Sequence, residues 1–100
     1  MTYRVVVTET AARHLHQVLS WLSDNHPRGY RVFESELRKA LHRLAIVPFS
    51  GAPYPHRPGT RRLLLRRSQY HLYYRVDSEN ERVEVRAVWA TRRGARPELD

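Results

Sequence analysis

Apolar residues recur along the first half of the chain with two different periods. Residues 3–7 are short and β-branched, which predicts a first strand. Apolar positions at helical spacing then predict a helix over residues 9–24, with Thr8 or Thr10 as its cap. Pro27 begins a second helix that extends to about residue 46. The two apolar stripes are Ala11, Leu15, Val18, Leu19 and Leu22, then Tyr30, Phe33, Leu37, Ala40, Leu41 and Leu44.

The second half of the chain alternates apolar and polar residues instead. Prolines and glycines interrupt residues 48–60, which predicts an ordered loop without regular structure. Strands are predicted over residues 61–67, 69–76 and 82–90. In the middle strand, Tyr70, Leu72, Tyr74 and Val76 share one face, and His71, Tyr73 and Arg75 share the other. In the last strand, Val83, Val85, Ala87 and Trp89 lie opposite Glu84, Arg86 and Val88.

These elements predict an α+β fold of order β-α-α-β-β-β. Two helices joined by a short turn form an antiparallel αα-hairpin, which we expect to pack on one face of a mostly antiparallel, four-stranded sheet. One hundred residues suffice for a single domain, residues 1–100. The polar stretch 91–100 is expected to be a flexible tail.

Composition excludes several classes of function. The chain has no cysteine, which excludes a disulfide scaffold, a thiol nucleophile and a cysteine-based metal centre. No pair among the six histidines has the spacing of a helical metal site, so neither a metal nor a cofactor is expected. No apolar run approaches the length of a membrane span and no signal-peptide pattern opens the chain, so we expect a cytoplasmic protein that does not contact a membrane.

Positive charge is concentrated in the middle of the chain. The formal net charge is +8 at pH 7. Residues 37–76 contain no acidic residue, while the remainder of the chain is close to neutral. Such asymmetry favours a polyanion or an acidic protein as partner.

The predicted strand faces place part of this charge on one open surface. If the tyrosines of the middle strand pack on the helices, then His71, Tyr73 and Arg75 point outward, joined by Arg86 and by Arg66 or Arg67. Arginine offers forked donors for phosphate, and aromatic rings stack on bases. The alternative is an ordinary solvated face of an arginine-rich protein. Likewise, His71 is either a general acid or base or a solvated histidine.

Four segments of the chain resemble a known family. They are the Leu44, Pro48 and Gly51 spacing, the Gly59–Leu65 strand entry, the Tyr70–Val76 strand and the Ala87–Gly94 exit. In this order, over about residues 3–97, the chain resembles the RelE/ParE toxins of bacterial type II toxin–antitoxin systems. The resemblance implies a cognate antitoxin that wraps the toxin in a hetero-oligomer. It also implies one of two activities, because ParE-like toxins inhibit DNA gyrase and RelE-like toxins cleave mRNA on the ribosome without metal.

The nuclease pattern of the RelE-like branch is incomplete in this chain. His71 stands where that branch has a catalytic arginine, Arg92 fits a second arginine, and no aromatic residue follows Trp89. We therefore favour a ParE-like toxin of a plasmid-stabilisation module that inhibits DNA gyrase and is not an enzyme. The alternative is a RelE-like, ribosome-dependent mRNA interferase, and an interaction partner whose toxicity has decayed is a third possibility.

Each hypothesis assigns a set of residues. Candidate catalytic residues, for a nuclease only, are His71, Arg75 and Arg92. Candidates for binding the target or a nucleic acid are Arg61, Arg62, Arg66, Arg67, Tyr73, Arg75, Arg86, Arg92 and Arg93. Candidates for binding the antitoxin are Trp21, Tyr30, Phe33, Arg66 and Arg75.

Overall fold

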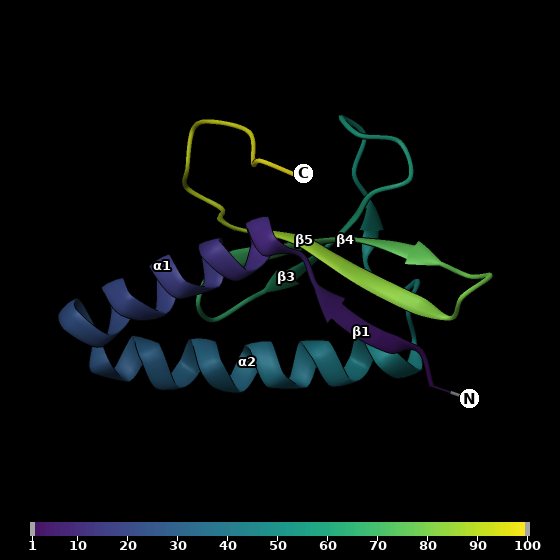
Figure 1. Cartoon of the computed structure of the whole chain (residues 1–100). Helices are drawn as coiled ribbons and strands as arrows, with labels where there is room; N and C mark the ends of the chain where they lie inside the picture. The colour runs from purple at the N-terminus through teal and green to yellow at the C-terminus, as the bar shows by residue number, and fades with distance from the viewer. Residues whose placement is uncertain (1, 100) are drawn as a thin grey trace.

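Two helices pack under a five-stranded sheet in the computed structural model, which describes residues 2–99 (Figure 1). The chain forms β1 (Arg4–Val7), α1 (Glu9–Asn25), α2 (Pro27–Ile46), β2 (Ala52–Pro53), β3 (Arg61–Leu65), β4 (Tyr70–Asp77) and β5 (Arg82–Ala90). The helices cover one face of the sheet, here called the inner face. The 54–60 loop and the C-terminal segment rise from the opposite, outer face (Figure 1).

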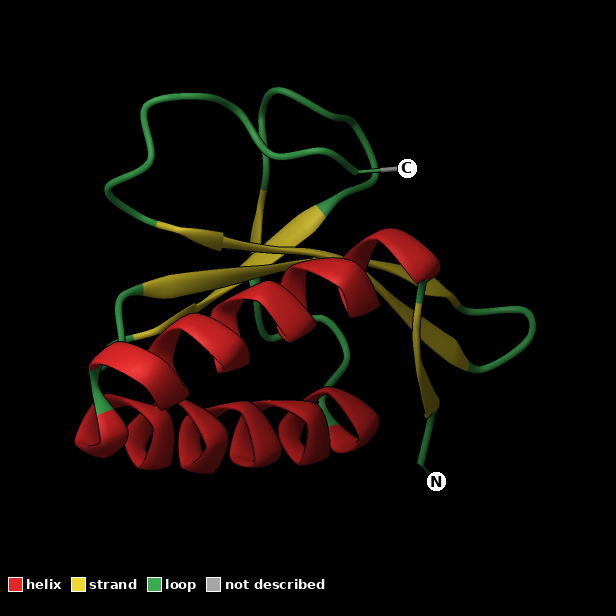
Figure 2. Cartoon of the chain, turned by 60° about the vertical axis from the view of Figure 1, so that its left-hand side comes forward, coloured by secondary structure: helices red, strands yellow, loops and turns green. Residues whose placement is uncertain are grey.

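Both predicted helices are confirmed to within one residue. Thr8 is the cap of α1, and its hydroxyl oxygen accepts a hydrogen bond from the Ala11 amide at 3.3 Å. Pro27 occupies the first turn of α2, where its missing N–H leaves no helical bond unmade. The two helices run antiparallel beneath the sheet (Figure 2).

The sheet has one strand more than the sequence predicted. Its order is β1-β5-β4-β3-β2, with β1 parallel to β5 and the other pairs antiparallel. The additional strand is β2, in the loop predicted to lack regular structure, and it pairs Ala52 with Arg62 and Pro53 with Arg61. Proline is tolerated there because β2 lies at the edge of the sheet and needs bonds on only one side.

A β-bulge in β5 changes which side chains face the helices. Opposite Tyr73 and Tyr74 of β4, the partners are Ala87 and Val85, so Arg86 is an extra residue. The predicted alternation is therefore wrong after Val85. Past the bulge, Val88 packs with the helices, whereas Ala87 and Trp89 move to the outer face. Periodicity alone could not show this, because one inserted residue inverts every later position.

Three apolar clusters hold these layers together. Two lie between the helices and the sheet, and they contain Leu22, Phe33, Ala40, Leu65, Leu72 and Val88, then Ala11, Leu44, Tyr74, Val83 and Val85. The third lies on the outer face and contains Tyr54, Tyr73, Ala87, Trp89 and Leu99. The outer face is thus partly a second small core rather than an open surface.

Among residues 2–99, no helix combines the length and the apolar character that crossing a bilayer requires.

Candidate functional site: an arginine-lined cleft

A cleft of about 220 Å³ opens on the outer face, between the 54–60 loop and the C-terminal segment. Two segments far apart in the sequence therefore form its walls over the ends of β4 and β5 (Figure 1). The lining residues are Tyr54, His56, Arg62, His71, Tyr73, Trp89, Ala90, Thr91, Arg93, Gly94, Ala95, Arg96 and Pro97. Among the residues that the structure describes, none of those lining the cleft is acidic.

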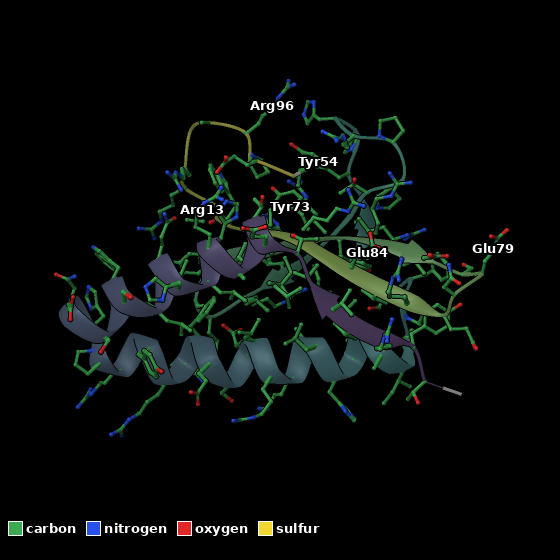
Figure 3. The ribbon with its side chains drawn as sticks, in the orientation of Figure 1. Arg13, Tyr54, Tyr73, Glu79, Glu84 and Arg96 are labelled. Carbon is green, nitrogen blue, oxygen red and sulfur yellow. The ribbon has the colours of Figure 1, made fainter. Side chains whose placement is uncertain are left out.

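Aromatic rings form the floor of the cleft. Tyr54 and Tyr73 meet edge to face with ring centroids 5.0 Å apart (Figure 3), and Trp89 packs in the same cluster. Tyr73 is only 4% exposed. Tyr73 lines the cleft with little exposed surface, because the loop and Leu99 pack over this face of the sheet, and its direct contact with a nucleic acid stays a prediction. Its role is to support Tyr54 and His71.

Two guanidinium groups stack on this floor. Arg62 lies over the Tyr54 ring at 5.4 Å, and Arg93 lies over the Trp89 ring at 4.0 Å. Cation–π contacts of this kind fix the direction of a flexible side chain without neutralising its charge. Both groups therefore remain available to an anion at the cleft. Arg96 extends from the top of the C-terminal segment, away from the sheet (Figure 3).

His71 lies half-buried beside Arg62. Burial lowers the pKa of the imidazole below its ordinary value, and the positive charge of Arg62 lowers the pKa further. The ring is consequently neutral at pH 7. A neutral imidazole next to a guanidinium is able to accept a proton from a substrate whose charge the arginine stabilises.

The C-terminal segment is held over the sheet at three points. The Trp89 indole N–H donates to the Ala95 carbonyl at 2.9 Å, and Leu99 is buried in the outer cluster. Glu98 lies 3.2 Å from both Arg13 and His14 of α1, and these two hydrogen bonds hold the pKa of Glu98 below its ordinary value. The mobility that the sequence predicts for residues 91–100 stays a prediction, and Asp100 lies outside the described residues.

Buried His14 connects this segment to the bulged strand. Its side chain is 3% exposed, and Nδ1 accepts a hydrogen bond from the Val88 amide at 3.2 Å. Because Nδ1 is the acceptor, the proton of the neutral ring is on Nε2, which donates to Glu98. One side chain therefore joins α1, β5 and the C-terminal segment.

The other arginines predicted for the outer face do not form one continuous surface. Arg86 donates to Glu84 at 2.7 Å, so it is neutralised rather than free for a target. Arg75 is exposed beside Gly59, whose φ of +83° is a conformation that glycine adopts readily. Arg61 points to the inner side and donates to the Gly51 carbonyl at 2.7 Å. None of these three arginines lines the cleft.

The β3–β4 turn and the tail carry the remaining arginines. Arg66 and Arg67 are exposed in the turn and do not line the cleft. Arg92 is exposed at the end of β5, but its neighbour Arg93 is the one that lines the cleft. Of the predicted set, the structure brings together Arg62, His71, Tyr73 and Arg93.

The residues predicted to bind an antitoxin are divided by the structure. Phe33 is 0% exposed and packs edge to face on Tyr70 at 5.1 Å, so its prediction as a contact residue is wrong. Tyr30 is half-buried against the inner core. Trp21, by contrast, is 53% exposed and lies beside the His26 ring.

Sequence reasoning missed Tyr54 and His56 as cleft residues. Both belong to the proline-rich loop, which only the pairing of β2 and the bond from the Tyr54 amide to the Thr60 carbonyl bring over the sheet. The signal available in the sequence was an aromatic residue, Tyr54, between two prolines of this loop. Within the described residues, no three histidine or carboxylate side chains are grouped so as to hold a metal.

Known proteins share the sequence pattern and the fold described above. Residues 5–94 match the family model described as the ParE toxin of the type II toxin–antitoxin system parDE. The chain belongs to this ParE toxin family. No curated protein matches the chain.

Solved structures agree with this family. The chain is similar to one from the RelBE2 toxin–antitoxin complex of Mycobacterium tuberculosis, with 30% identity, a TM-score of 0.65, and 90% of this chain and 99% of that chain covered. It is similar in fold to a chain of the chromosomal ParDE system of P. aeruginosa, with 20% identity, a TM-score of 0.71, and coverages of 88% and 95%. An E. coli RelE toxin mutant in the free state shows 27% identity and a TM-score of 0.65, with coverages of 92% and 86%. The predicted α+β fold and toxin family are both confirmed.

Proposed function

We propose that this ParE-family toxin acts in the cytoplasm by inhibiting DNA gyrase, and that it binds its target through the arginine-lined cleft. The observation that carries the proposal is the match of residues 5–94 to the ParE toxin model. The cleft supports it because Arg62 and Arg93 present positive charge over an aromatic floor, with no lining carboxylate among the described residues. Such a surface suits DNA phosphates or an acidic protein surface.

A supercoiling assay with purified gyrase and relaxed plasmid tests the proposal. We expect the toxin to block supercoiling and to leave cleaved DNA when the reaction is stopped with detergent. Arg62→Ala/Arg93→Ala should weaken inhibition at least about tenfold, since each charge-assisted contact is worth about 1 kcal/mol or more. The matched control, Arg28→Ala/Arg31→Ala, removes two exposed arginines of α2 that do not line the cleft and should inhibit like the parent. Normal supercoiling at saturating toxin would refute the proposal.

One observation favours a second candidate function, ribosome-dependent cleavage of mRNA. His71 is neutral at pH 7 and lies in the cleft beside Arg62. In this mechanism the imidazole accepts the proton of the 2′-hydroxyl as its oxygen bonds to the adjacent phosphorus, and a guanidinium stabilises the charge that develops on the phosphate. The bond from phosphorus to the 5′-oxygen breaks, and that oxygen leaves as a hydroxyl after taking a proton from water, which gives a 2′,3′-cyclic phosphate and a free 5′-hydroxyl end. Cleaved mRNA on programmed ribosomes, with gyrase unaffected, would establish this activity, and His71→Ala should then abolish cleavage. Intact mRNA on ribosomes treated with the toxin would refute this second function.

We also infer that a cognate antitoxin neutralises the toxin in a hetero-oligomeric complex. Two of the similar chains come from structures described as toxin–antitoxin complexes, RelBE2 of M. tuberculosis and RelBE of E. coli. Co-expression with the protein encoded by the adjacent gene tests this. Rescued growth together with co-purification is the expected result, and growth arrest that persists would contradict it.

A further inference from the structure

The side of α2 that faces away from the sheet carries a row of basic side chains. Figure 3 shows nitrogen-tipped side chains extending from α2 on the side opposite the sheet. With about 100° of rotation per residue, four basic residues of this helix fall within an arc of about 100°. They are Arg28, Arg31, Arg38 and Lys39, here called the α2 stripe, and all four are exposed.

The α2 stripe lies opposite the apolar face of the same helix. Phe33, Ala40 and Leu44 are buried between the helix and the sheet, about half a turn around the helix axis from the stripe. Burial of that face fixes the rotation of α2 about its axis. The direction of the stripe therefore depends on the packed core, and the basic residues face solvent on a rigid element.

Both carboxylates of α2 lie outside the stripe. Glu36 extends to the β3–β4 turn, where it accepts hydrogen bonds from the Arg67 amide at 2.9 Å and the Ser68 amide at 2.8 Å. Glu34 lies about 40° beyond the arc, and its ion pair with Arg38 is 3.8 Å long with both side chains more than half exposed. Water and salt screen such a pair, so Arg38 keeps most of its attraction for an external anion.

The α2 stripe has the length to follow a nucleic-acid backbone. From Arg28 to Lys39 it covers about 16 Å of helix, at about 1.5 Å per residue. One strand of duplex DNA carries a phosphate about every 3.4 Å along the duplex axis, so this length faces about five phosphates. The four cations thus meet a similar number of phosphates. Arginine also presents forked donors that fit phosphate oxygens.

The composition of the stripe favours a polyanion over an acidic protein. Stable protein interfaces usually bury an aromatic or aliphatic anchor near their centre. Of the described residues with large, exposed apolar side chains, Ile46 is the one in α2, and it lies at the C-terminal end of the helix, beyond the stripe. Binding to phosphates needs only charge, because the release of condensed counterions from DNA supplies the free energy.

We propose that the α2 stripe binds the backbone of duplex DNA, independently of sequence, as a second site on the far side of the molecule from the cleft. The helices cover the inner face of the sheet and the cleft opens on the outer face, so the two sites do not overlap (Figure 1). The inference rests on the proposed function in one respect, that the toxin acts on an enzyme bound to DNA. The stripe holds the toxin on DNA, and the cleft binds the target.

The salt dependence of DNA binding counts the phosphate contacts. The logarithm of the association constant falls with the logarithm of salt concentration by about 0.9 for each phosphate that a cation neutralises, so four contacts predict a slope of about −3.6. Arg28→Ala/Arg31→Ala should reduce the slope to about −1.8 and weaken binding at least about tenfold at about 0.1 M salt. Fluorescence anisotropy of a labelled duplex of random sequence, titrated between about 50 and 200 mM salt, gives both values.

Two control variants separate the stripe from charge elsewhere on the protein. Arg28→Lys/Arg31→Lys keeps both charges in place and should retain the slope of the parent within about 0.5. Arg75→Ala/Arg92→Ala removes two exposed arginines outside α2 and the cleft, and should retain that slope as well. Equal loss in this variant, or an unchanged slope in Arg28→Ala/Arg31→Ala, would refute the stripe as a site. Tighter binding of a duplex RNA of the same length would overturn its assignment to DNA.

NMR chemical shifts locate the bound duplex on the protein. Addition of DNA should move the backbone amide signals of α2 and leave the indole N–H signal of Trp89, which lines the cleft, in place. Movement of the Trp89 signal with the α2 signals unchanged would place the DNA in the cleft and overturn the inference.

Gyrase inhibition by the same proteins distinguishes this inference from the proposed function. Non-specific contacts with DNA are weak, with a Kd of about 10⁻⁴–10⁻⁶ M at physiological salt. Arg28→Ala/Arg31→Ala leaves the cleft intact, so it should inhibit gyrase as the parent does while losing affinity for free duplex. That pair of results supports both proposals. DNA binding through the stripe by a parent that does not inhibit gyrase would support the stripe and refute the proposed target. Inhibition by a parent whose DNA binding does not depend on Arg28 and Arg31 would refute the stripe alone.

Discussion

Replacing Glu36 by glutamine should destabilise the protein more than its position on a helix surface would suggest. The Glu36 side chain extends from α2 to the β3–β4 turn and accepts three hydrogen bonds, from the amides of Arg67 and Ser68 and from the Ser68 hydroxyl. The same turn places Gln69 at a φ of 62°, a left-handed conformation that costs a non-glycine residue free energy. The carboxylate therefore compensates for strain in the turn that joins two strands.

The size of the expected loss in unfolding free energy follows from the hydrogen-bond donors that lose their acceptor in Glu36→Gln. Glutamine keeps one carbonyl oxygen, but its NH₂ group would face a backbone N–H, and leaving a polar group unsatisfied costs about 1–3 kcal/mol. The contact with Arg67 is exposed to water, which softens the loss. We expect Glu36→Gln to lower the free energy of unfolding by about 1.5 kcal/mol, or the Tm by about 6–12 °C for a domain of this size.

The stability difference between the parent and Glu36→Gln should also depend on pH, and the pKa of Glu36 fixes the direction of that dependence. Burial opposes the charged form of Glu36, but the hydrogen bonds from Arg67 and Ser68 outweigh burial and hold the pKa below its ordinary value of 4.5. A pKa lowered on folding stabilises the native state above that ordinary value. The difference between parent and Glu36→Gln should therefore be complete above pH 4.5 and disappear as the pH falls through the lowered pKa.

Urea unfolding at a series of pH values measures this difference. Glu34→Gln is the matched control, because it makes the same change on the same helix, and the ion pair of Glu34 with Arg38 is exposed and 3.8 Å long. That pair should contribute at most about 0.5 kcal/mol. A Glu36→Gln variant within about 0.5 kcal/mol of the parent at pH 7, or a difference that persists in acid, would refute the reasoning.

Three further predictions concern the sheet and the cleft. Tyr74→Phe leaves the buried Gly51 amide without its acceptor at 2.8 Å, so urea unfolding should show a loss of about 1–3 kcal/mol. His14→Ala removes the acceptor of the Val88 amide and the donor to Glu98, so hydrogen exchange of Val88 and of residues 95–99 should accelerate at least about tenfold. Arg62→Ala removes a positive charge beside His71, so an NMR titration should find the imidazole pKa moved back up toward its ordinary value. Unchanged unfolding of Tyr74→Phe would contradict the bond to Gly51, and unchanged hydrogen exchange in His14→Ala would contradict the bonds to Val88 and Glu98. An unchanged imidazole pKa in Arg62→Ala would contradict the effect of Arg62 on His71.

Much of the fold was determined by local sequence. The apolar stripes from Ala11 to Leu22 and from Tyr30 to Leu44 predicted both helices, and Pro27 predicted the break between them. These features depend on residues within one or two helical turns of each other, so they can be recognised in the sequence without knowledge of tertiary contacts. The alternation from Tyr70 to Val76 likewise predicted which side chains of β4 face the helices, because no insertion interrupts that strand.

Tertiary structure alone decided the cleft. The bulge at Arg86 turns Trp89 to the outer face, and the loop brings Tyr54 over it from more than thirty residues away in the sequence. His14 then ties the C-terminal segment across the same face through Glu98. Each of these steps depends on a contact between distant segments, whose formation outweighs local preference because it buries aromatic surface and satisfies polar groups. Local periodicity carries no record of such contacts, so the sequence by itself predicted an open basic face where the structure has a partly covered cleft.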